Sequence, residues 1–173
     1  MSVPTAQAEW ALRRLTVRTA DYLNMTQTPA TVGRHLPDRF ATRDANALVD
    51  LVAAAEAFCV ARLATVGITA EVTTWDKRAK AWLKQGVDLV KDYPGWHAFM
   101  GFVEVRNAIQ HGLGRLTDRQ LGKHKQETLR YIASAGIGLN GDAIIIGRDD
   151  VIRCDHACST FIRWLDRAAR PAT

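Results

Sequence analysis

The sequence has few cysteines and no long apolar segment. Its 173 residues include only three cysteines, Cys59, Cys154 and Cys158. Because such a small, odd number does not form a disulfide framework, we expect a reduced, cytoplasmic protein. No segment contains the roughly 18 apolar residues of a membrane span, and no apolar run follows a basic start as in a signal peptide. The sequence therefore predicts a protein without a membrane partner.

The sequence also lacks an internal repeat, a glycine-rich phosphate loop and a complete set of metal ligands. The one candidate set combines Cys154 and Cys158 with His156. The two cysteines share one face of a helix, whereas His156 points away from that face and no second ligand cluster follows. We interpret both cysteines as core residues, and we expect neither a metal nor another cofactor.

The chain does contain enough apolar material for one globular domain. Hydrophobic residues make up 47% of the sequence and charged residues 24%, which is an ordinary balance for a folded protein. The length suits a single domain covering residues 1–173. The formal net charge of +5 favours anionic partners such as nucleic acid.

Apolar residues at three- and four-residue spacing predict an all-α fold, a helical bundle of five or six helices. An N-terminal helix covers about residues 6–25, and the core of the domain covers about residues 40–170. Residues 26–43 are interrupted by proline and glycine, so they predict a long connection. The next helix covers residues 44–66, with Thr42 or Asp44 as its N-cap.

Capping and helix-breaking residues predict the remaining elements. Gly67 ends the helix over residues 44–66, and Thr117 followed by Gln120 has the form of a capping box. The predicted elements are a helix from Thr73 or Thr74 to about residue 86, a helix over 94–111, a helix over 117–133, a β-like run over 143–146, a turn over 147–150 and a last helix over 151–169. The β-like run leaves room for one small β-hairpin before the last helix.

The helix predicted over residues 94–111 carries the polar residues with the clearest chemistry. Apolar residues surround most of its circumference, so this helix belongs in the middle of the bundle. Polar side chains on such a helix are costly unless they are paired. An explanation is therefore needed for four polar residues of this helix: Glu104, Arg106, Asn107 and His111.

Arg106, Asn107 and His111 are the residue types that cleavage of RNA requires. His111 lies at the end of the helix, and histidine titrates near neutral pH. Arg106 offers a planar fork of donors for a phosphate, and Asn107 can hold a ring nitrogen or a ribose hydroxyl. In RNA transesterification a base activates the 2′-hydroxyl, a cation stabilises the phosphorane and an acid protonates the leaving 5′-oxygen, so no metal is required.

An ideal helix does not aim the two main candidates at one point. Successive residues turn by about 100°, so Arg106 and His111 lie about 140° apart. His97, Glu104 and His111 repeat every seven residues and share one stripe, which is also the spacing of packed helices. A second copy of the helix across a two-fold axis would bring the groups together, so we expect a homodimer through this helix.

One hexapeptide resembles the signature of HEPN domains, in which an arginine is followed by a polar residue, three further residues and a histidine. It comprises residues 106–111, Arg-Asn-Ala-Ile-Gln-His, and Gly112 follows it. The resemblance implies a homodimeric endoribonuclease with one composite cleft that leaves a 2′,3′-cyclic phosphate. It also implies a toxin or abortive-infection effector with an antitoxin or regulatory protein as partner. Leu113 stands where one subgroup has a tyrosine, so the resemblance does not extend to control by nucleotide transfer.

Glu56 and Glu104 are the supporting residues, and one or the other is predicted to hold Arg106. Glu56 lies at the edge of the apolar face of its helix, beside Cys59. An arginine buried against either carboxylate is also a purely structural arrangement, and this alternative stays open.

Basic residues follow the hexapeptide, and three of them are candidates for binding RNA: Arg115, Arg119 and Lys123. They can track a phosphate backbone into a cleft. They can equally form a solvated helix face, because Asp118 and Glu127 are interspersed with them.

The sequence therefore predicts a metal-independent endoribonuclease that cleaves single-stranded RNA through its 2′-hydroxyl. The alternative is a non-catalytic HEPN-like module that binds RNA, a nucleotide or a protein partner. A third class is a helical adaptor, which would need no exposed cationic cleft.

Overall fold

The computed structural model describes residues 3–27, 38–69 and 72–169. Within these ranges the chain forms eight helices and one two-stranded antiparallel sheet, so the predicted all-α class is confirmed. The elements in chain order are α1 (Ala6–Gln27), α2 (Asp38–Thr65), α3 (Trp75–Lys84), α4 (Leu89–Asp92), α5 (Trp96–Gly112), α6 (Asp118–Leu121), α7 (Lys125–Ser134), β1 (Gly138–Asn140), β2 (Ala143–Ile145) and α8 (Arg148–Ala168).

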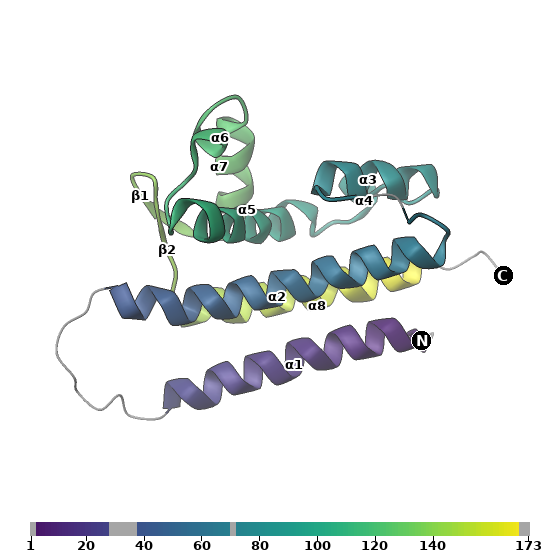
Figure 1. The fold of residues 1–173 in the computed structure, drawn as a ribbon, viewed down its shortest axis with the longest axis horizontal. Helices are drawn as coiled ribbons and strands as arrows, with labels where there is room; N and C mark the ends of the chain where they lie inside the picture. Colours follow the sequence, from purple (N-terminus) through teal and green to yellow (C-terminus); the bar gives the residue numbers. More distant parts are fainter. Residues whose placement is uncertain (1–2, 28–37, 70–71, 170–173) are drawn as a thin grey trace.

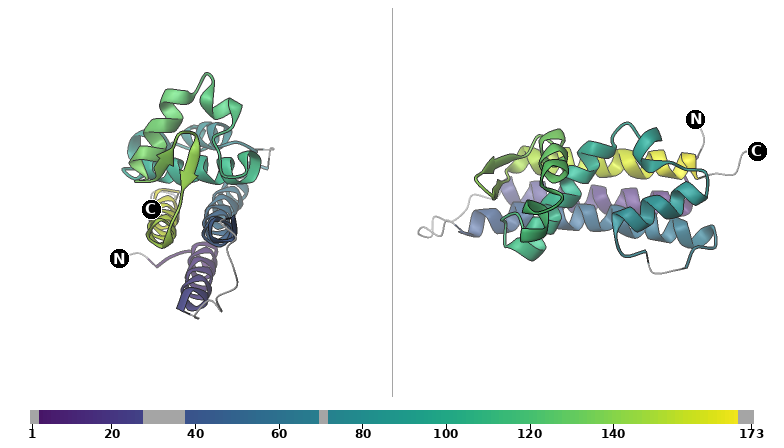
Figure 2. Two further views of the ribbon diagram at one scale, coloured as in Figure 1. Left: turned by 90° about the vertical axis from the view of Figure 1, so that its left-hand side faces the viewer. Right: turned by 90° about the horizontal axis from the view of Figure 1, so that it is seen from above.

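Helices α2 and α8 lie side by side, α1 packs against both of them on one face, and the shorter elements form a layer on the opposite face (Figures 1 and 2). Helix α5 lies over α2 and α8 and contacts both. Helices α3 and α4 lie near one end of α5, whereas α6, α7 and the hairpin lie near the other end (Figure 1). The predicted central helix is thus covered on several sides, as its apolar circumference requires.

An aromatic cluster joins α3 and α5 to the long helix α8. The ring of Phe99 on α5 stacks on that of Phe161 on α8, with centroids 4.3 Å apart and planes at 11°. Trp75 of α3 packs edge-on against both rings, at 4.9 Å and 5.6 Å. All three side chains are buried, and each aromatic pair contributes about 0.5–1.5 kcal/mol beyond the area it buries. This cluster fixes α3 and α5 relative to each other, which positions the candidate site between them.

Several predicted boundaries agree with the structure. The Thr74 side chain caps α3 by accepting the Lys77 N–H, and the Thr117–Gln120 capping box begins α6. Gly67 follows α2 with φ at +80°, a conformation that glycine adopts without strain. The predicted hairpin forms as β1 and β2.

The predicted connection over residues 26–43 is too long. Helix α1 continues to Gln27 and α2 already begins at Asp38; residues 28–37 lie outside the described ranges. Asp44 is therefore not an N-cap. It is buried and accepts a hydrogen bond of 2.7 Å from the Tyr22 hydroxyl, so contact with α1 determines its role.

The helix predicted over residues 117–133 is broken into α6 and α7. Gly122 ends α6 with φ −84° and ψ −129°, which is not a helical conformation. Glycine has a low helix propensity, so the local capping box of α6 and the packing of α7 on α5 override a continuous helix here.

Two further boundaries and one short helix differ from the prediction. Helix α8 begins at Arg148 rather than after a turn, because the Asp150 carboxylate accepts the Gly147 N–H at 2.8 Å. Helix α5 begins at Trp96, just after Pro94. The short helix α4 was not predicted; Asp88 caps its start by accepting two backbone N–H groups.

The three cysteines are buried in the core, which agrees with the interpretation of Cys154 and Cys158. The indole N–H of Trp82 donates to the Cys59 Sγ at 3.3 Å, and burial raises the pKa of Cys154. Among the residues that the structure describes, no group of three His, Cys, Asp or Glu side chains is arranged to hold a metal. None of the described helices combines the length and the apolar character of a membrane span.

Candidate active site

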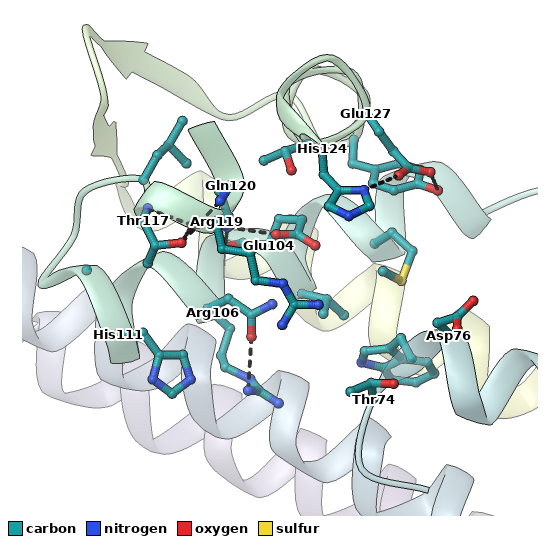
Figure 3. Close-up of a pocket in the computed structure, with 18 of the residues that line it drawn as sticks. Thr74, Asp76, Glu104, Arg106, His111, Thr117, Arg119, Gln120, His124 and Glu127 are labelled. Carbon is teal, nitrogen blue, oxygen red and sulfur yellow. Dashed lines mark hydrogen bonds and ion pairs between the residues drawn. The ribbon is translucent and has the colours of Figure 1, made fainter. Parts of the chain in front are cut away.

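A broad open groove, about 1180 Å³ in volume, lies between α3, α5 and the segment of α6 and α7 (Figure 3). Seven of the predicted site residues line it: Glu56, Glu104, Arg106, Asn107, His111, Arg115 and Arg119. Lys123 is exposed in the turn between α6 and α7, and it does not belong to this lining.

Arg106 is anchored by Glu56. The Nη2 of Arg106 forms an ion pair with the Glu56 Oε2, and the two side chains are 16% and 14% exposed. The other carboxylate oxygen of Glu56 accepts hydrogen bonds of 2.9 Å from the Trp75 Nε1 and the Arg78 Nη1. A single carboxylate on α2 therefore joins α3 to α5 and holds the arginine at the wall of the groove, as predicted for Glu56.

The guanidinium group of Arg106 also binds two neutral amides of its own helix. Its Nη1 donates to the Asn107 Oδ1 and to the Gln110 Oε1, both at 3.1 Å. Its Nε is buried and has no hydrogen-bond partner in the described part of the chain. Three of the five donors of the guanidinium are thus in use, and one of the three contacts is charged.

Glu104 does not contact the arginine. Its side chain accepts a hydrogen bond of 2.7 Å from the Gln120 Nε2, which also donates to the Glu104 backbone carbonyl at 2.9 Å. Glu104 therefore holds α6 against α5. The sequence predicts Gln120 only as a capping residue, because a capping pattern does not identify long-range partners.

His111 lies in the last turn of α5 and is exposed. Within the described ranges, no hydrogen bond or ion pair fixes its imidazole ring. The helix ends directly after it: Gly112 is the last helical residue, and Leu113 takes a left-handed conformation with φ at +52°. Arg106 and His111 line the same groove within one chain, although the two residues lie on different sides of an ideal helix (Figure 3).

The stripe of His97, Glu104 and His111 is partly covered by the chain itself. The ring of His97 lies 5.4 Å from that of Tyr131 on α7, and Glu104 is bound by Gln120. Packing of α7 on α5 thus explains much of the seven-residue repeat. The homodimer through this helix stays a prediction.

The basic residues after the hexapeptide differ in their surroundings. Arg115 forms an ion pair with Asp142, and its Nε donates to the Asp142 Oδ2 at 3.2 Å. Arg119 lines the groove, and no side chain of the described ranges pairs with it. Of the three candidates, Arg119 is the one cation available to a ligand in the groove.

Four residues of the site were not predicted from the sequence: Trp75, Arg78, Gln110 and His124. Trp75 and Arg78 were seen only as parts of a helix, because the periodicity of α3 does not show that this helix meets Glu56. Gln110 lies within the hexapeptide, four residues after Arg106, where side chains on a helix meet. His124 was placed inside a continuous helix, so its position at a helix start was hidden.

Comparison of the chain with models of protein families, with curated proteins and with solved structures finds no match. The interpretation of the groove therefore depends on its own contacts. These place the anchored guanidinium of Arg106 around one open space with His111 and Arg119, which have no partner among the described residues.

Proposed function

We propose that this protein is a metal-independent endoribonuclease that cleaves single-stranded RNA through its 2′-hydroxyl. The observation that carries the proposal is the pair formed by Arg106, anchored on Glu56, and His111, exposed and unpaired within the described ranges, at one groove. The resemblance of residues 106–111 to the HEPN signature supports the same chemistry.

His111 acts as the general base in the proposed reaction. Its neutral imidazole removes the proton of the 2′-hydroxyl, and the 2′-oxygen attacks the adjacent phosphorus. The bond from phosphorus to the 5′-oxygen breaks, and that oxygen takes up a proton. The products are a 2′,3′-cyclic phosphate and a free 5′-hydroxyl.

Arg106 stabilises the negative charge that develops on the phosphate. Charge-assisted hydrogen bonds to a phosphate are stronger than those to neutral amides. A phosphate can therefore displace the side chains of Asn107 and Gln110 from the Arg106 Nη1, whereas the charged contact to Glu56 keeps the guanidinium in place. Asn107 is then free to accept a hydrogen bond from the ribose.

Arg119 supports binding of the strand near the reacting phosphate. Its guanidinium faces the groove in Figure 3 and has no partner among the described residues. Acidic residues also line the groove, including Asp76 and Glu127. Binding therefore depends on local contacts with Arg106 and Arg119 rather than on a uniformly positive surface.

The test is cleavage of a short single-stranded RNA by the purified protein in the presence of EDTA. We expect cleavage with a 2′,3′-cyclic phosphate product. His111→Ala is expected to lower the rate by about 10²–10⁴-fold, since it removes a proton-transfer group. Arg106→Ala is expected to lower it by about 10²–10³-fold, since it removes a charge-stabilising donor.

His156→Ala is the matched control, because His156 is an exposed histidine on α8 and does not line the groove. It is expected to keep the parental rate. Equal cleavage by His111→Ala and the parent would contradict the proposal. Binding of RNA without any cleavage would favour the non-catalytic module.

A further inference from the structure

A second histidine, His124, lines the same groove as His111. It lies directly before α7, in the break that Gly122 makes between α6 and α7. Its side chain is 53% exposed, and its Nδ1 lies 3.7 Å from the Glu127 Oε2. This contact is on the Nδ1 side of the ring, so the Nε2 is left for a ligand.

The two histidines enter the groove from different elements. In the view of Figure 3 their imidazole rings lie on opposite sides of the Arg119 guanidinium, with Arg106 below. Packing of α7 on α5 and the two Gln120 contacts to Glu104 hold the segment that carries His124 against the helix that carries His111. The arrangement is therefore part of the fold of one chain.

Cleavage of RNA through the 2′-hydroxyl needs two proton transfers at different oxygens. One group removes the proton of the 2′-hydroxyl, and a second group protonates the departing 5′-oxygen. The two oxygens lie on opposite sides of the phosphorus in an in-line displacement. Two imidazoles on either side of cationic side chains match this requirement.

We propose that His124 is the general acid of the reaction and that it acts within the same chain as His111. The inference rests on the proposed function. The protonated His124 gives its Nε2 proton to the 5′-oxygen as the bond from phosphorus to that oxygen breaks. His111 has meanwhile taken the proton of the 2′-hydroxyl, so one imidazole gains the proton that the other loses. Exchange with water restores both.

Glu127 positions the acid. Its carboxylate lies one helical turn after His124, on the Nδ1 side of the ring, and the Tyr131 hydroxyl donates to the Glu127 Oε1 at 3.0 Å. This contact fixes the carboxylate, and the carboxylate orients the imidazole. The nearby Glu127 carboxylate distinguishes His124 from His111, whose ring has no such contact in the described ranges.

The experiment compares two dinucleotide substrates that differ in one atom. In the first the leaving group is the normal 5′-oxygen; in the second that oxygen is replaced by sulfur. A thiol has a pKa of about 8.5, so a thiolate departs without being protonated. Loss of a general acid therefore slows cleavage of the first substrate and spares the second.

We expect His124→Gln to cleave the oxygen substrate about 10²–10⁴-fold more slowly than the parent and the sulfur substrate at nearly the parental rate. His111→Ala is expected to lose cleavage of both substrates. Activity on the sulfur substrate also shows that the His124→Gln chain is folded. His156→Gln serves as the control and should cleave both substrates as the parent does.

Three other outcomes are distinguishable. If the parent cleaves neither substrate, the proposed function fails. If the parent cleaves both and His124→Gln cleaves the oxygen substrate equally fast, the function stands and the inference is overturned, which leaves a partner copy as the source of the acid. If His124→Gln loses both substrates to the same extent, His124 is not the acid.

Discussion

Glu56 is the residue on which the candidate site depends most. Its carboxylate accepts from Trp75, Arg78 and Arg106 on two other helices. Its side chain is 14% exposed, and those of the two arginines are 10% and 16% exposed. Removal of its charge leaves two guanidinium groups close together with little access to water.

Glu56→Gln is expected to lower the free energy of unfolding by about 3 kcal/mol, the lower end for breaking a buried ion pair. It should also slow RNA cleavage, because Arg106 loses its anchor. Urea unfolding measures the first effect. Asp76→Asn is the control, because it breaks an ion pair with Lys80 in which both side chains are more than two-thirds exposed. This variant should lower the free energy of unfolding by less than about 1 kcal/mol. An equal loss in both variants would contradict the role given to Glu56.

The sequence predicted the contact between Glu56 and Arg106 but not the contacts of Glu56 with Trp75 and Arg78. Glu56 could be identified because an acid at the edge of an apolar helix face needs a partner, and Arg106 lies on the helix most deeply buried. Arg78 could not be identified in this way. It is buried with its guanidinium 4.9 Å from the Trp75 ring, and nothing in the spacing of α3 distinguishes it from a solvated lysine or arginine.

At the scale of elements, the close approach of α7 to α5 decides where His124 lies. Gly101 of α5 permits it. A Cβ at this position would lie 2.6 Å from the Ala135 Cβ and still closer to the Tyr131 carbonyl oxygen. These neighbours include backbone atoms, so they cannot turn aside as a long side chain can.

Gly101→Ala is therefore expected to push α7 away from α5 and to destabilise the protein by about 1–3 kcal/mol. Since His124 lies directly before α7, this variant should also lose cleavage of the normal RNA substrate. Thermal unfolding and the cleavage assay measure the two effects. Gly138→Ala is the control, because the nearest atoms to its Cβ would be 3.8 Å away. Unchanged stability in Gly101→Ala would show that α5 and α7 can accommodate the added methyl group and would contradict this prediction.

Element prediction succeeded where a local signal was strong. Thr74, Gly67 and the Thr117–Gln120 box marked boundaries that the structure confirms. It was wrong over residues 38–43, where proline and glycine nearby suggested a connection, and at Gly122, where one residue ends a helix. At Gly122 the packing of α7 on α5 outweighs the local preference for one continuous helix.

At the scale of the whole molecule, burial of titratable side chains predicts sensitivity to high pH. Burial raises the pKa of Cys59 from 9.0 to about 12, and it also raises the pKa values of Cys154 and Tyr93. A group whose pKa is raised by folding contributes stability below its unfolded pKa and loses it as the pH rises.

The free energy of unfolding is therefore expected to fall from about pH 9 upwards, by about 1 kcal/mol for each such thiol at about pH 10. Urea unfolding at a series of pH values measures the slope. Tyr93→Phe removes one of the titrating groups, so its stability should fall less steeply with pH than that of the parent. A flat profile up to about pH 10 would mean that these side chains are accessible to water.

The all-α class, the central apolar helix and the presence of Arg106 and His111 near the end of that helix follow from the sequence alone. These depend on the order of residues along one element, through periodicity, capping and the cost of burying a charge. Only the tertiary structure decided that one groove brings Arg106 and His111 together within a single chain, that Glu104 holds Gln120 rather than the arginine, and that His124 faces the same groove. The physical reason is that a contact between residues far apart in sequence depends on how helices pack, and packing is determined by the shapes of several elements at once.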